Sequence, residues 1–221
     1  MIESDFQTLY SVPLFSGYSD SEIKQLIASA ECTVRDYSAE EIILLRGDKL
    51  RSIGIVLSGR LNGIIETEEG QLTVVNELNK GSVFGDVLSG SSGNSPVTVK
   101  AMDNSRILWI ELNRVLHLCG ENIDNIKFVM NFIEEISDKY FMLSKRIRIL
   151  SERKPRIRIL EYIKQLSIEQ NTNDVLLPQK NRSELADYLA CDRAALSREL
   201  GKMHKEGILR INRNIITIMN N

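Results

Sequence analysis

Two arginines near the C-terminus, Arg193 and Arg198, have the chemistry to read DNA bases. A guanidinium group can donate two hydrogen bonds to the edge of a guanine in the major groove. Ala194 between them offers a methyl group that can contact thymine, and other polar side chains surround this segment. The predicted DNA-binding residues are Asn181, Arg182, Arg193, Ala194, Ser197, Arg198, Lys202 and Arg213.

The segment from Asn181 to Gly207 predicts two short helices joined by a tight turn, which is the element that would position these side chains. Asn181 and Asp192 are suitable N-caps, and Ala190-Cys191 supplies small side chains where the two helices approach. The apolar positions that face inward are Leu185, Ala186 and Leu189 in the first helix and Leu196, Leu200 and Met203 in the second. This pattern is typical of a helix-turn-helix. The alternative is a solvated helical hairpin in which Arg and Lys are only surface charge.

The residues after Gly207 favour the DNA-binding interpretation. Two β-prone runs, Ile208–Ile211 and Ile215–Ile218, flank a polar turn at residues 212–214, which predicts a hairpin. A helix-turn-helix followed by a hairpin is a winged helix. The distribution of charge also favours DNA binding by the C-terminal part. Residues 1–150 carry 15 Lys and Arg against 21 Asp and Glu, whereas residues 151–221 carry 13 Lys and Arg against 9 Asp and Glu. A basic C-terminal region that follows an acidic N-terminal region is typical of a protein that binds DNA through one domain only.

Short β-prone runs separated by Gly, Asn and Asp occupy the region from Cys32 to Glu111. Such spacing without intervening helices predicts a β-roll of the jelly-roll type. A capping box at Ser19 and Glu22 predicts a short helix before it, and Asn113–Leu118 predicts another after it. Glu68-Glu69-Gly70 is expected to be a hairpin turn. The predicted strands are Thr33–Tyr37, Glu41–Leu45, Ile53–Leu57, Leu61–Thr67, Leu72–Leu78, Val97–Ala101 and Ile107–Glu111.

The longest periodic segment follows the β-region and predicts a helix that pairs with another helix. Its apolar residues repeat at alternating steps of three and four, the spacing of a coiled-coil seam. They are Ile126, Val129, Ile133, Ile136, Tyr140, Leu143, Ile147 and Leu150. We expect the residues from Ile126 to Ile147 to form a homodimer interface; the alternative is a helix buried on its own β-region.

Pro155 marks the next boundary, because proline is accepted in the first turn of a helix but not inside one. Ser151–Lys154 is therefore expected to be a hinge. The fold class is α+β with three parts: residues 1–120 form the β-roll, 121–150 the dimerisation helix and 151–221 the winged helix. No apolar run is long enough for a membrane span, which predicts a cytoplasmic protein.

Taken in order, these features resemble the CRP/FNR family of transcription regulators over almost the whole chain. The motifs that carry the resemblance are Leu14-Phe15-Ser16-Gly17, Gly47-Asp48, Ile55-Val56-Leu57-Ser58-Gly59 and Gly81-Ser82-Val83-Phe84-Gly85-Asp86, with the long helix and the winged helix-turn-helix after them. The resemblance implies a cyclic-nucleotide-binding-type roll, a homodimer, and paired winged helices on a pseudo-palindromic operator. The partners implied are double-stranded DNA, a second copy of the chain, a small-molecule effector and RNA polymerase.

The sequence departs from the cAMP-binding branch of the family at the phosphate site. That branch has an Arg-Ser pair where this chain has Ser95-Pro96, so the main cation for a cyclic phosphate is missing. Tyr140 and Phe141 stand where that branch offers small hydroxyl side chains. We therefore expect an apolar organic effector; the alternative is a roll that is filled and takes no effector. The predicted effector-pocket residues are Gly85, Asp86, Val87, Ser95, Pro96, Val97, Tyr140 and Phe141.

Cofactor chemistry is not expected. The iron–sulfur branch uses an N-terminal cysteine cluster, and residues 1–31 contain no cysteine. The haem branch needs a histidine in the roll, but the two histidines are His117 and His204. A cupin-like enzyme would need clustered His and carboxylate ligands, and no His lies within the roll. Two alternatives to an effector-controlled regulator stay open: a constitutive DNA-binding protein, and one modulated by oxidation of Cys32, Cys119 or Cys191.

Overall fold

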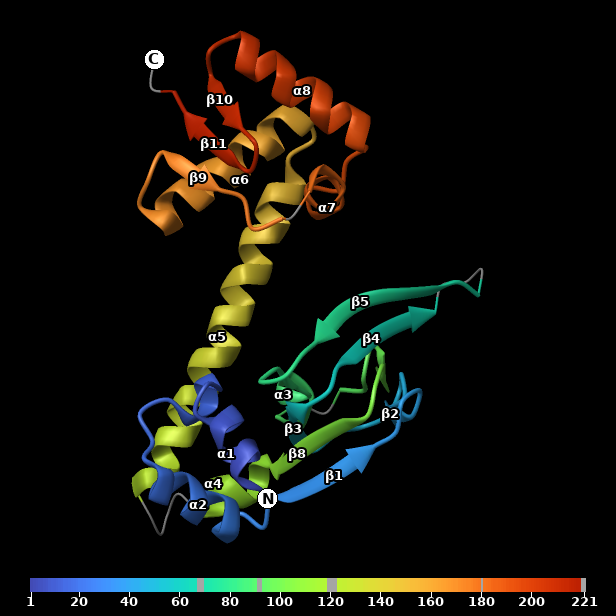
Figure 1. Ribbon diagram of the computed structural model, residues 1–221, viewed down its shortest axis with the longest axis vertical. Coiled ribbons are helices and arrows are strands. Elements are labelled where there is room, and N and C mark those ends of the chain that lie inside the picture. The colour runs from blue at the N-terminus through green and yellow to red at the C-terminus, as the bar shows by residue number, and fades with distance from the viewer. Residues whose placement is uncertain (67–69, 91–92, 119–122, 180, 220–221) are drawn as a thin grey trace. The chain divides into compact units, whose positions relative to one another are not determined.

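The computed structural model describes the 221-residue chain except for residues 67–69, 91–92, 119–122, 180 and 220–221 (Figure 1). The chain divides into two compact units, Met1–Asp138 and Lys139–Asn221. The division falls inside the long helix α5 (Ile123–Ser151), whereas the sequence placed boundaries at residues 120 and 150. Among the described residues, no helix is long and apolar enough to span a membrane.

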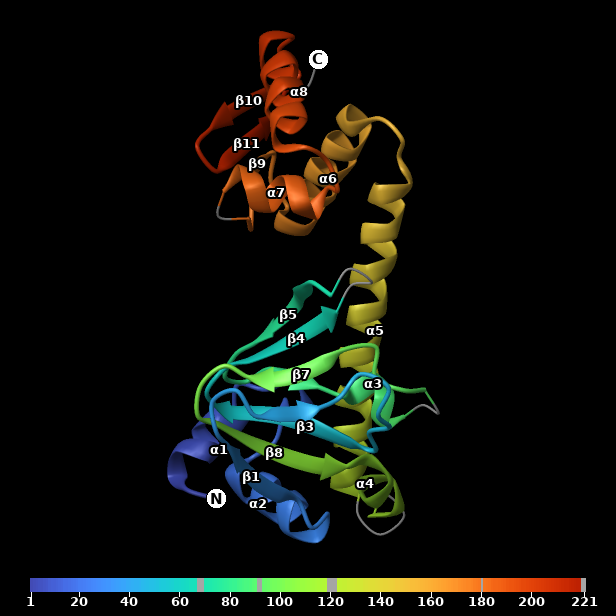
Figure 2. The ribbon, with the colours of Figure 1, turned by 90° about the vertical axis from the view of Figure 1, so that its right-hand side faces the viewer.

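The N-terminal unit is a β-roll flanked by helices, as predicted. Two four-stranded antiparallel sheets, in the orders β1-β8-β3-β6 and β2-β7-β4-β5, form its layers (Figure 2). The strands are β1 (Thr33–Tyr37), β2 (Ile42–Leu44), β3 (Ser52–Ser58), β4 (Leu61–Glu66), β5 (Leu72–Leu78), β6 (Val83–Phe84), β7 (Thr98–Ala101) and β8 (Ser105–Glu111). The helices are α1 (Glu3–Leu9), the 3-10 turn η1 (Pro13–Phe15), α2 (Asp20–Ser29), α3 (Asp86–Ser89), α4 (Leu112–Leu118) and the first part of α5.

All seven predicted strands are present, although some ends shift by one or two residues. The prediction from β-prone runs between turn residues succeeds even for β1 and β5, which bury no residue fully, whereas β3, β4, β7 and β8 bury two or more each. Two short elements, β6 and α3, and the N-terminal helix α1 were not predicted. Of the predicted hairpin turn, Glu68 and Glu69 lie outside the described residues, while Gly70 has a positive φ of 78°.

Strand β3 shows how the N-terminal unit builds two cores. Ile53, Ile55 and Leu57 point to one face and join a cluster with Phe128 and Phe132 of α5. Val56 points to the other face and packs between the two sheets with Leu44, Leu61, Phe84, Val99, Ala101 and Ile107. Successive side chains of a strand point to opposite faces of the sheet. A strand that is buried on both faces therefore has a continuous run of apolar residues in its sequence.

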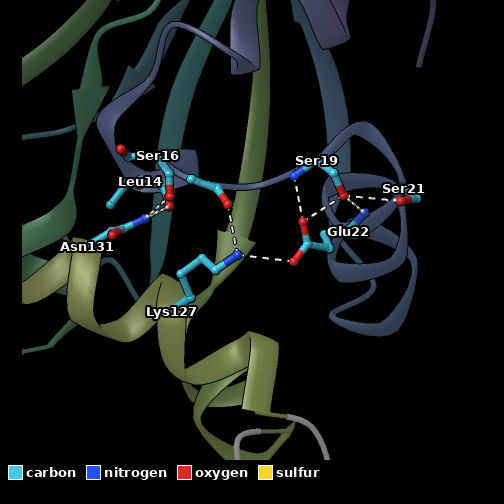
Figure 3. Close-up of polar contacts among 8 residues, drawn as sticks. Leu14, Ser16, Ser19, Ser21, Glu22, Lys127 and Asn131 are labelled. Atoms are coloured by element: carbon cyan, nitrogen blue, oxygen red, sulfur yellow. Dashed lines mark hydrogen bonds and ion pairs between the residues drawn. The ribbon is translucent and has the colours of Figure 1, made fainter.

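Polar contacts fix the start of α5 to the segment between η1 and α2 (Figure 3). Lys127 Nζ donates to the carbonyl of Gly17 at 2.8 Å, forms an ion pair with Glu22 Oε1 at 3.0 Å and lies 4.6 Å from the centre of the Tyr18 ring. Asn131 Nδ2 donates to the carbonyls of Leu14 and Ser16, both at 3.0 Å. These contacts hold the first turns of α5 on the N-terminal unit.

Glu22 makes the stability of this contact depend on pH. Hydrogen bonds from the Ser19 hydroxyl and backbone, together with Lys127, lower the pKa of its carboxyl to about 2. A carboxylate with a lowered pKa stabilises the folded state above its unfolded pKa and loses that effect as the pH falls towards the folded value. We expect Glu22→Gln to lower the free energy of unfolding at pH 7, and the deficit to shrink as the pH falls from about 4.5 towards 2. Urea titrations over this range measure it.

The control for that experiment is Glu134→Gln, because Glu134 is an exposed carboxylate of the same unit. It should show no comparable deficit at any pH. A deficit for Glu22→Gln that stays constant from pH 7 to pH 2.5 would contradict the role of the charge.

The C-terminal unit joins the last turns of α5 to a winged helix. Its further elements are α6 (Pro155–Gln170), β9 (Asp174–Leu176), α7 (Arg182–Tyr188), α8 (Arg193–Lys205), β10 (Leu209–Asn212) and β11 (Ile215–Ile218). The three strands form an antiparallel sheet in the order β10-β11-β9. Pro155 begins α6 as predicted, and the predicted hairpin is present, with β9 added to its edge.

The end of α5 is part of this unit. Ile149 is buried in its core, Lys145 Nζ lies 2.8 Å from Glu169 Oε1, and Arg146 lies 5.1 Å from the centre of the Tyr188 ring. Arg158 Nε donates to the carbonyl of Glu152 at 2.7 Å, so the segment between α5 and α6 is also held. The hinge expected at residues 151–154 coincides with this junction and stays a prediction.

Candidate nucleic-acid interface

The helix-turn-helix forms where the sequence predicts it because both helices are capped by their own side chains. Asn181 Oδ1 accepts from the backbone N–H groups of Ser183 at 2.9 Å and Glu184 at 3.0 Å. Asp192 Oδ1 accepts from the N–H of Ala195 at 2.9 Å. These bonds satisfy amides that have no partner inside the helix. The two helix starts are therefore fixed locally.

The turn between the helices is held from outside by Arg158 of α6. Its Nη1 donates to the carbonyl of Leu189 at 3.0 Å and to that of Ala190 at 2.8 Å. Ala190 has a positive φ of 47°, which a small side chain tolerates better than a bulky one. Sequence reasoning missed the part played by Arg158, because its partners lie some thirty positions away and have no local signal.

The predicted division between inner and outer faces is confirmed. The predicted inward residues are buried: they are Leu185 and Ala186 in α7, Leu189 at the C-cap of α7, and Leu196, Leu200 and Met203 in α8. The predicted outward residues of the first two turns of α8 are exposed, and these are Arg193, Ala194, Ser197 and Arg198. A helix that buries one face in its domain can present the other to the major groove.

The predicted DNA-binding arginines have no carboxylate partner among the described residues. In the described part of the chain, Arg182, Arg193, Arg198 and Arg213 form no ion pair. By contrast, Arg156 of the same unit pairs with Glu206, and this contact raises the arginine pKa and lowers that of Glu206. Unpaired guanidinium groups keep all their donors for an external anion or base edge.

Lys202 is the predicted DNA ligand that the structure places least favourably. It is exposed, but its Nζ lies 2.8 Å from Glu199 Oε1 one turn earlier on the same face. An anion at that distance offsets the attraction of the lysine for phosphate. The spacing of three residues could have indicated this pair from the sequence.

The wing presents Arg213 at its tip. Asn212 of β10 is opposite Ile215 of β11, so Arg213 and Asn214 form the two-residue turn, and Arg213 has a positive φ of 52°. Asn214 Nδ2 donates to the carbonyls of Leu177 at 2.9 Å and Gln179 at 3.2 Å. These bonds tie the wing to the segment before α7.

A hollow of about 460 Å³ lies where the wing and the two helices meet, and three arginines line it. Its lining residues are Leu177, Asn181, Arg182, Arg193, Arg213 and Asn214. The sequence predicted Asn181 and the arginines as DNA contacts, and the structure brings these four together. It did not predict Asn214, which positions the wing.

The effector residues predicted in the roll are close together but use their polar groups internally. Ser95 is 2% exposed, and its hydroxyl donates to the carbonyl of Val97 at 2.7 Å. The Ser95 backbone bonds to Gly47 and Asp48, each at 2.8 Å. Asp86 is buried, while Val87 and Pro96 are exposed. Among the predicted residues of the roll there is no cation to receive a phosphate.

Apolar side chains fill the interior beside Gly85. A Cβ added at Gly85, whose φ is 73°, would lie 2.3 Å from Leu50 Cδ2. Leu50, Leu88 and Val97 pack on the core between the sheets, where Phe84 meets Trp109 edge to face with centroids 5.3 Å apart. This packing agrees with the alternative of a filled roll. Tyr140 and Phe141 belong to the other compact unit, so a pocket shared by all the predicted residues stays a prediction.

The predicted dimer seam of α5 is largely uncovered. Ile126, Ile133, Tyr140, Leu143 and Ile147 are all exposed, Tyr140 by 65% and Leu143 by 58%. Val129 and Ile136 are partly buried against the core of the N-terminal unit. Exposed apolar patches of this kind mark interaction surfaces, and a second helix is the expected partner. The homodimer itself stays a prediction.

In the described residues, the cysteines and histidines do not form a metal site, and the cysteines form no disulfide. Cys32 and Cys191 are free thiols, and burial raises the pKa of both, that of Cys32 to about 12. Cys119 lies outside the described residues. His117 and His204 are exposed, and in the part of the chain that is described no group of three His, Cys, Asp or Glu side chains could hold a metal ion.

Oxidative control through Cys32 is therefore expected to fail. At pH 8 a thiol with a pKa near 12 is ionised to about one part in 10⁴, against roughly one quarter for an ordinary cysteine. We expect iodoacetamide to alkylate Cys32 about three orders of magnitude more slowly than free cysteine, as read by mass spectrometry of peptides. Alkylation at the rate of free cysteine would contradict the burial argument.

Comparisons with known proteins agree with this architecture. Residues 34–122 match the family model "Cyclic nucleotide-binding domain". The potassium channel KAT1 of Oryza sativa subsp. japonica is 28% identical over 57% of this chain, but the chain spans only 17% of the channel. The shared part is thus a module that also occurs in larger proteins of other kinds.

Two relatives match over most of the chain. The fumarate and nitrate reduction regulatory protein of Escherichia coli is 26% identical over 79% of this chain and 70% of its own length. The cAMP-activated global transcriptional regulator Vfr of Pseudomonas aeruginosa is 19% identical over 82% of this chain and 87% of its own. Among solved structures, CprK complexed with OCPA covers 90% of this chain and 89% of its own, with 18% identity and a TM-score of 0.60, which supports the fold.

Proposed function

We propose that this chain, which belongs to the CRP/FNR family of transcription regulators, is a homodimeric, sequence-specific DNA-binding regulator. In this proposal α8 enters the major groove, with Arg193 and Arg198 taking guanines and Ala194 contacting a thymine methyl group. Two winged helices related by two-fold symmetry would bind half-sites ~34 Å apart on one face of the duplex. The protein would act in the cytoplasm, with RNA polymerase as a further partner.

The observation that carries the proposal is a set of four arginines on the winged helix that form no ion pair in the described chain: Arg193, Arg198 and Arg213 are exposed, and Arg182 is half-buried. Other arginines of this unit do pair with carboxylates, as Arg148 does with Glu161 at 3.8 Å. Of the arginines without an ion pair in the described chain, Arg182 lies at the start of α7, Arg193 and Arg198 lie on α8, and Arg213 lies at the wing tip, while others such as Arg35, Arg60 and Arg210 lie elsewhere. Clustered positive charge on one face supplies the phosphate attraction that most DNA affinity requires.

The proposed control works through α5. An effector bound in the roll near Gly85 to Val97 would favour one arrangement of the seam around Tyr140, and the hinge at residues 151–154 would pass that change to α8. The energy available is the difference in effector affinity between the two arrangements. The effector would be an apolar organic molecule, because Ser95 stands at the position where a cation would be needed for a cyclic phosphate.

A second candidate is a constitutive DNA-binding regulator whose roll takes no effector. The packing of Leu50 against Gly85 and the internal bond of Ser95 favour it. Thermal-shift measurements with cAMP, cGMP and a panel of aromatic acids separate the two, because a ligand of the folded state raises the melting temperature. A shift with an aromatic acid supports effector control, and no shift with any compound supports the constitutive form.

The experiment that tests DNA binding is selection of bound duplexes from a random library, followed by fluorescence anisotropy at fixed salt. We expect a pseudo-palindromic consensus that is bound roughly 10³-fold or more tightly than an unrelated duplex. Recovery of no consensus, together with no salt-dependent affinity for any duplex, would overturn the proposed function.

A further inference from the structure

Three backbone carbonyls of the C-terminal unit receive hydrogen bonds from one side chain, that of Arg158 in α6. Its Nε donates to the carbonyl of Glu152 at 2.7 Å, and its Nη1 donates to the carbonyls of Leu189 at 3.0 Å and Ala190 at 2.8 Å. Glu152 is the first residue after α5, whereas Leu189 and Ala190 belong to the turn of the helix-turn-helix. One half-buried guanidinium therefore joins two segments that lie more than thirty residues apart in the sequence.

The acceptor in the first of these segments is anchored to α5. The N–H of Glu152 donates to the carbonyl of Ile149 at 3.2 Å, a bond that continues the last turn of the helix past Ser151. Ile149 is buried in the core of the C-terminal unit. The Glu152 carbonyl is therefore fixed to the end of α5, and the hydrogen bond to that carbonyl ties Arg158 to the same helix.

The acceptors in the second segment decide where α8 begins. Ala190 has a positive φ of 47° and stands two residues before Asp192, the N-cap of α8. The last carbonyls of a helix have no partner inside it, so a guanidinium at the end of α7 supplies donors that the backbone lacks. Bonds to the carbonyls of Leu189 and Ala190 restrain the direction in which the chain enters α8. Arg193 and Arg198 lie in the first two turns of that helix, so their position depends on the same bonds.

An aromatic contact reaches the end of α7 from α5 as well. Tyr188, the last residue of α7, packs on Tyr162 of α6 with ring centroids 4.8 Å apart. The guanidinium of Arg146 in α5 lies 5.1 Å from the centre of the Tyr188 ring, a distance at which a cation is attracted to an aromatic face. The contacts of Arg146 and Arg158 therefore both end on residues 188–190.

We infer that Arg158 is a positioning residue for base reading: it links the end of α5 to the turn before α8 and thereby sets the orientation in which Arg193 and Arg198 meet the bases. The inference rests on the proposed function. It also gives the path by which a change in α5 would reach α8, because Arg158 spans the expected hinge at residues 151–154. Its Nε and Nη1 donors are used by backbone carbonyls, so we assign it no base or phosphate contact.

The test uses the full-length protein with the selected operator and with an unrelated duplex of equal length. Binding of Arg158→Met is measured by anisotropy from 0.05 to 0.3 M salt. We expect operator affinity to fall roughly tenfold to 100-fold, because misplaced arginines lose part of their base contacts. Affinity for the unrelated duplex should fall by less than about threefold, and the salt slope should stay unchanged, because no phosphate contact is lost.

Two control variants match the loss of an arginine and the loss of hydrogen bonds. Arg148→Met removes an exposed arginine of α5 whose partner is Glu161, away from the turn. Gln170→Ala removes two hydrogen bonds to the backbone of Leu176, which also lies away from the turn. Both variants should keep the operator preference of the parent protein. An unchanged preference for Arg158→Met, measured beside these controls, would overturn the inference and leave the proposed function intact.

Arg158→Lys tests whether the link itself matters, and it remains informative should the methionine variant not fold. A single ammonium group lacks the fork of donors that reaches both segments, so lysine should recover only part of the lost preference. Full recovery would show that the link is not needed. The effect of Arg158→Met should also shrink in an Arg198→Ala background, because one of the arginines that it places is then absent. An undiminished effect there would contradict positioning through α8.

Hydrogen exchange of the free protein tests the link without DNA. The amides of residues 149–153 and 188–192 should both exchange roughly tenfold faster in Arg158→Met than in the parent protein, and at the parent rate in Gln170→Ala. Unchanged exchange in these segments would overturn the link, whether or not the protein binds DNA. Faster exchange in a protein whose parent binds no duplex would instead remove the proposed function, and with it the role in base reading, while the link between the segments would stand.

Discussion

Arg198→Ala is expected to remove most of the preference for the operator over unrelated DNA. A bidentate contact between arginine and guanine contributes about 1–3 kcal/mol of discrimination, and a homodimer makes the contact in both half-sites. The expected loss is therefore about 2–6 kcal/mol, or roughly 30-fold to more than 10⁴-fold in operator affinity. Arg198 is exposed on α8 and its side chain has no protein partner in the described structure, so its removal should leave the fold unchanged.

Anisotropy with the operator and with an unrelated duplex, at one salt concentration, measures this ratio. Lys205→Ala is the matched control, because Lys205 is an exposed cation in the last turn of the same helix. It should lower both affinities slightly and leave the ratio unchanged. An unchanged ratio for Arg198→Ala would exclude this arginine as a base reader.

Leu143→Asp is expected to convert the dimer to a monomer. Leu143 is 58% exposed on α5 and adds little to the core of its own unit, so each unit should stay folded. In a paired helix the same side chain would be buried, and loss of a buried leucine costs about 2–5 kcal/mol. Two copies meet at the seam, so the dissociation constant should rise by at least about three orders of magnitude.

Sedimentation equilibrium from 1 to 100 μM protein measures the dissociation constant of the dimer, and circular dichroism checks that the helix content is unchanged. Glu134→Lys is the control, because it changes the charge of an exposed α5 residue that is not part of the seam. The monomeric variant should also lose operator affinity, since two-site binding adds an effective local concentration that a single module lacks. A Leu143→Asp protein that sediments as the parent dimer would show that the seam is not the interface.

How much of the fold could be predicted depends on whether its signals are local. Strands β1 and β5 and the caps of α7 and α8 were predicted because β-prone runs between turn residues and capping pairs act within a few residues. Helix α1 was missed because its Asp5 caps the backbone of Ile2, a residue that is not a usual cap, and is buried against Arg106 across the fold. Strand β6 was missed because two residues are too few to show a period.

The candidate site divides in the same way. The outward face of α8 follows from helical spacing and was predicted correctly, whereas the pairing of Lys202 with Glu199 was overlooked. The hollow of three arginines could not be predicted, because it depends on Asn214 reaching a segment more than thirty residues earlier. Long-range hydrogen bonds of this kind have no sequence period, and they decide which exposed cations act together.

The most direct measurement is the stoichiometry and spacing of the complex with the selected operator. Sedimentation of the protein with a labelled duplex should give two chains per duplex, and inserting five base pairs between the half-sites should sharply lower affinity, because half a helical turn places the second half-site on the opposite face. One chain per duplex, with an affinity that does not change on insertion, would contradict a symmetric pair of winged helices joined through α5.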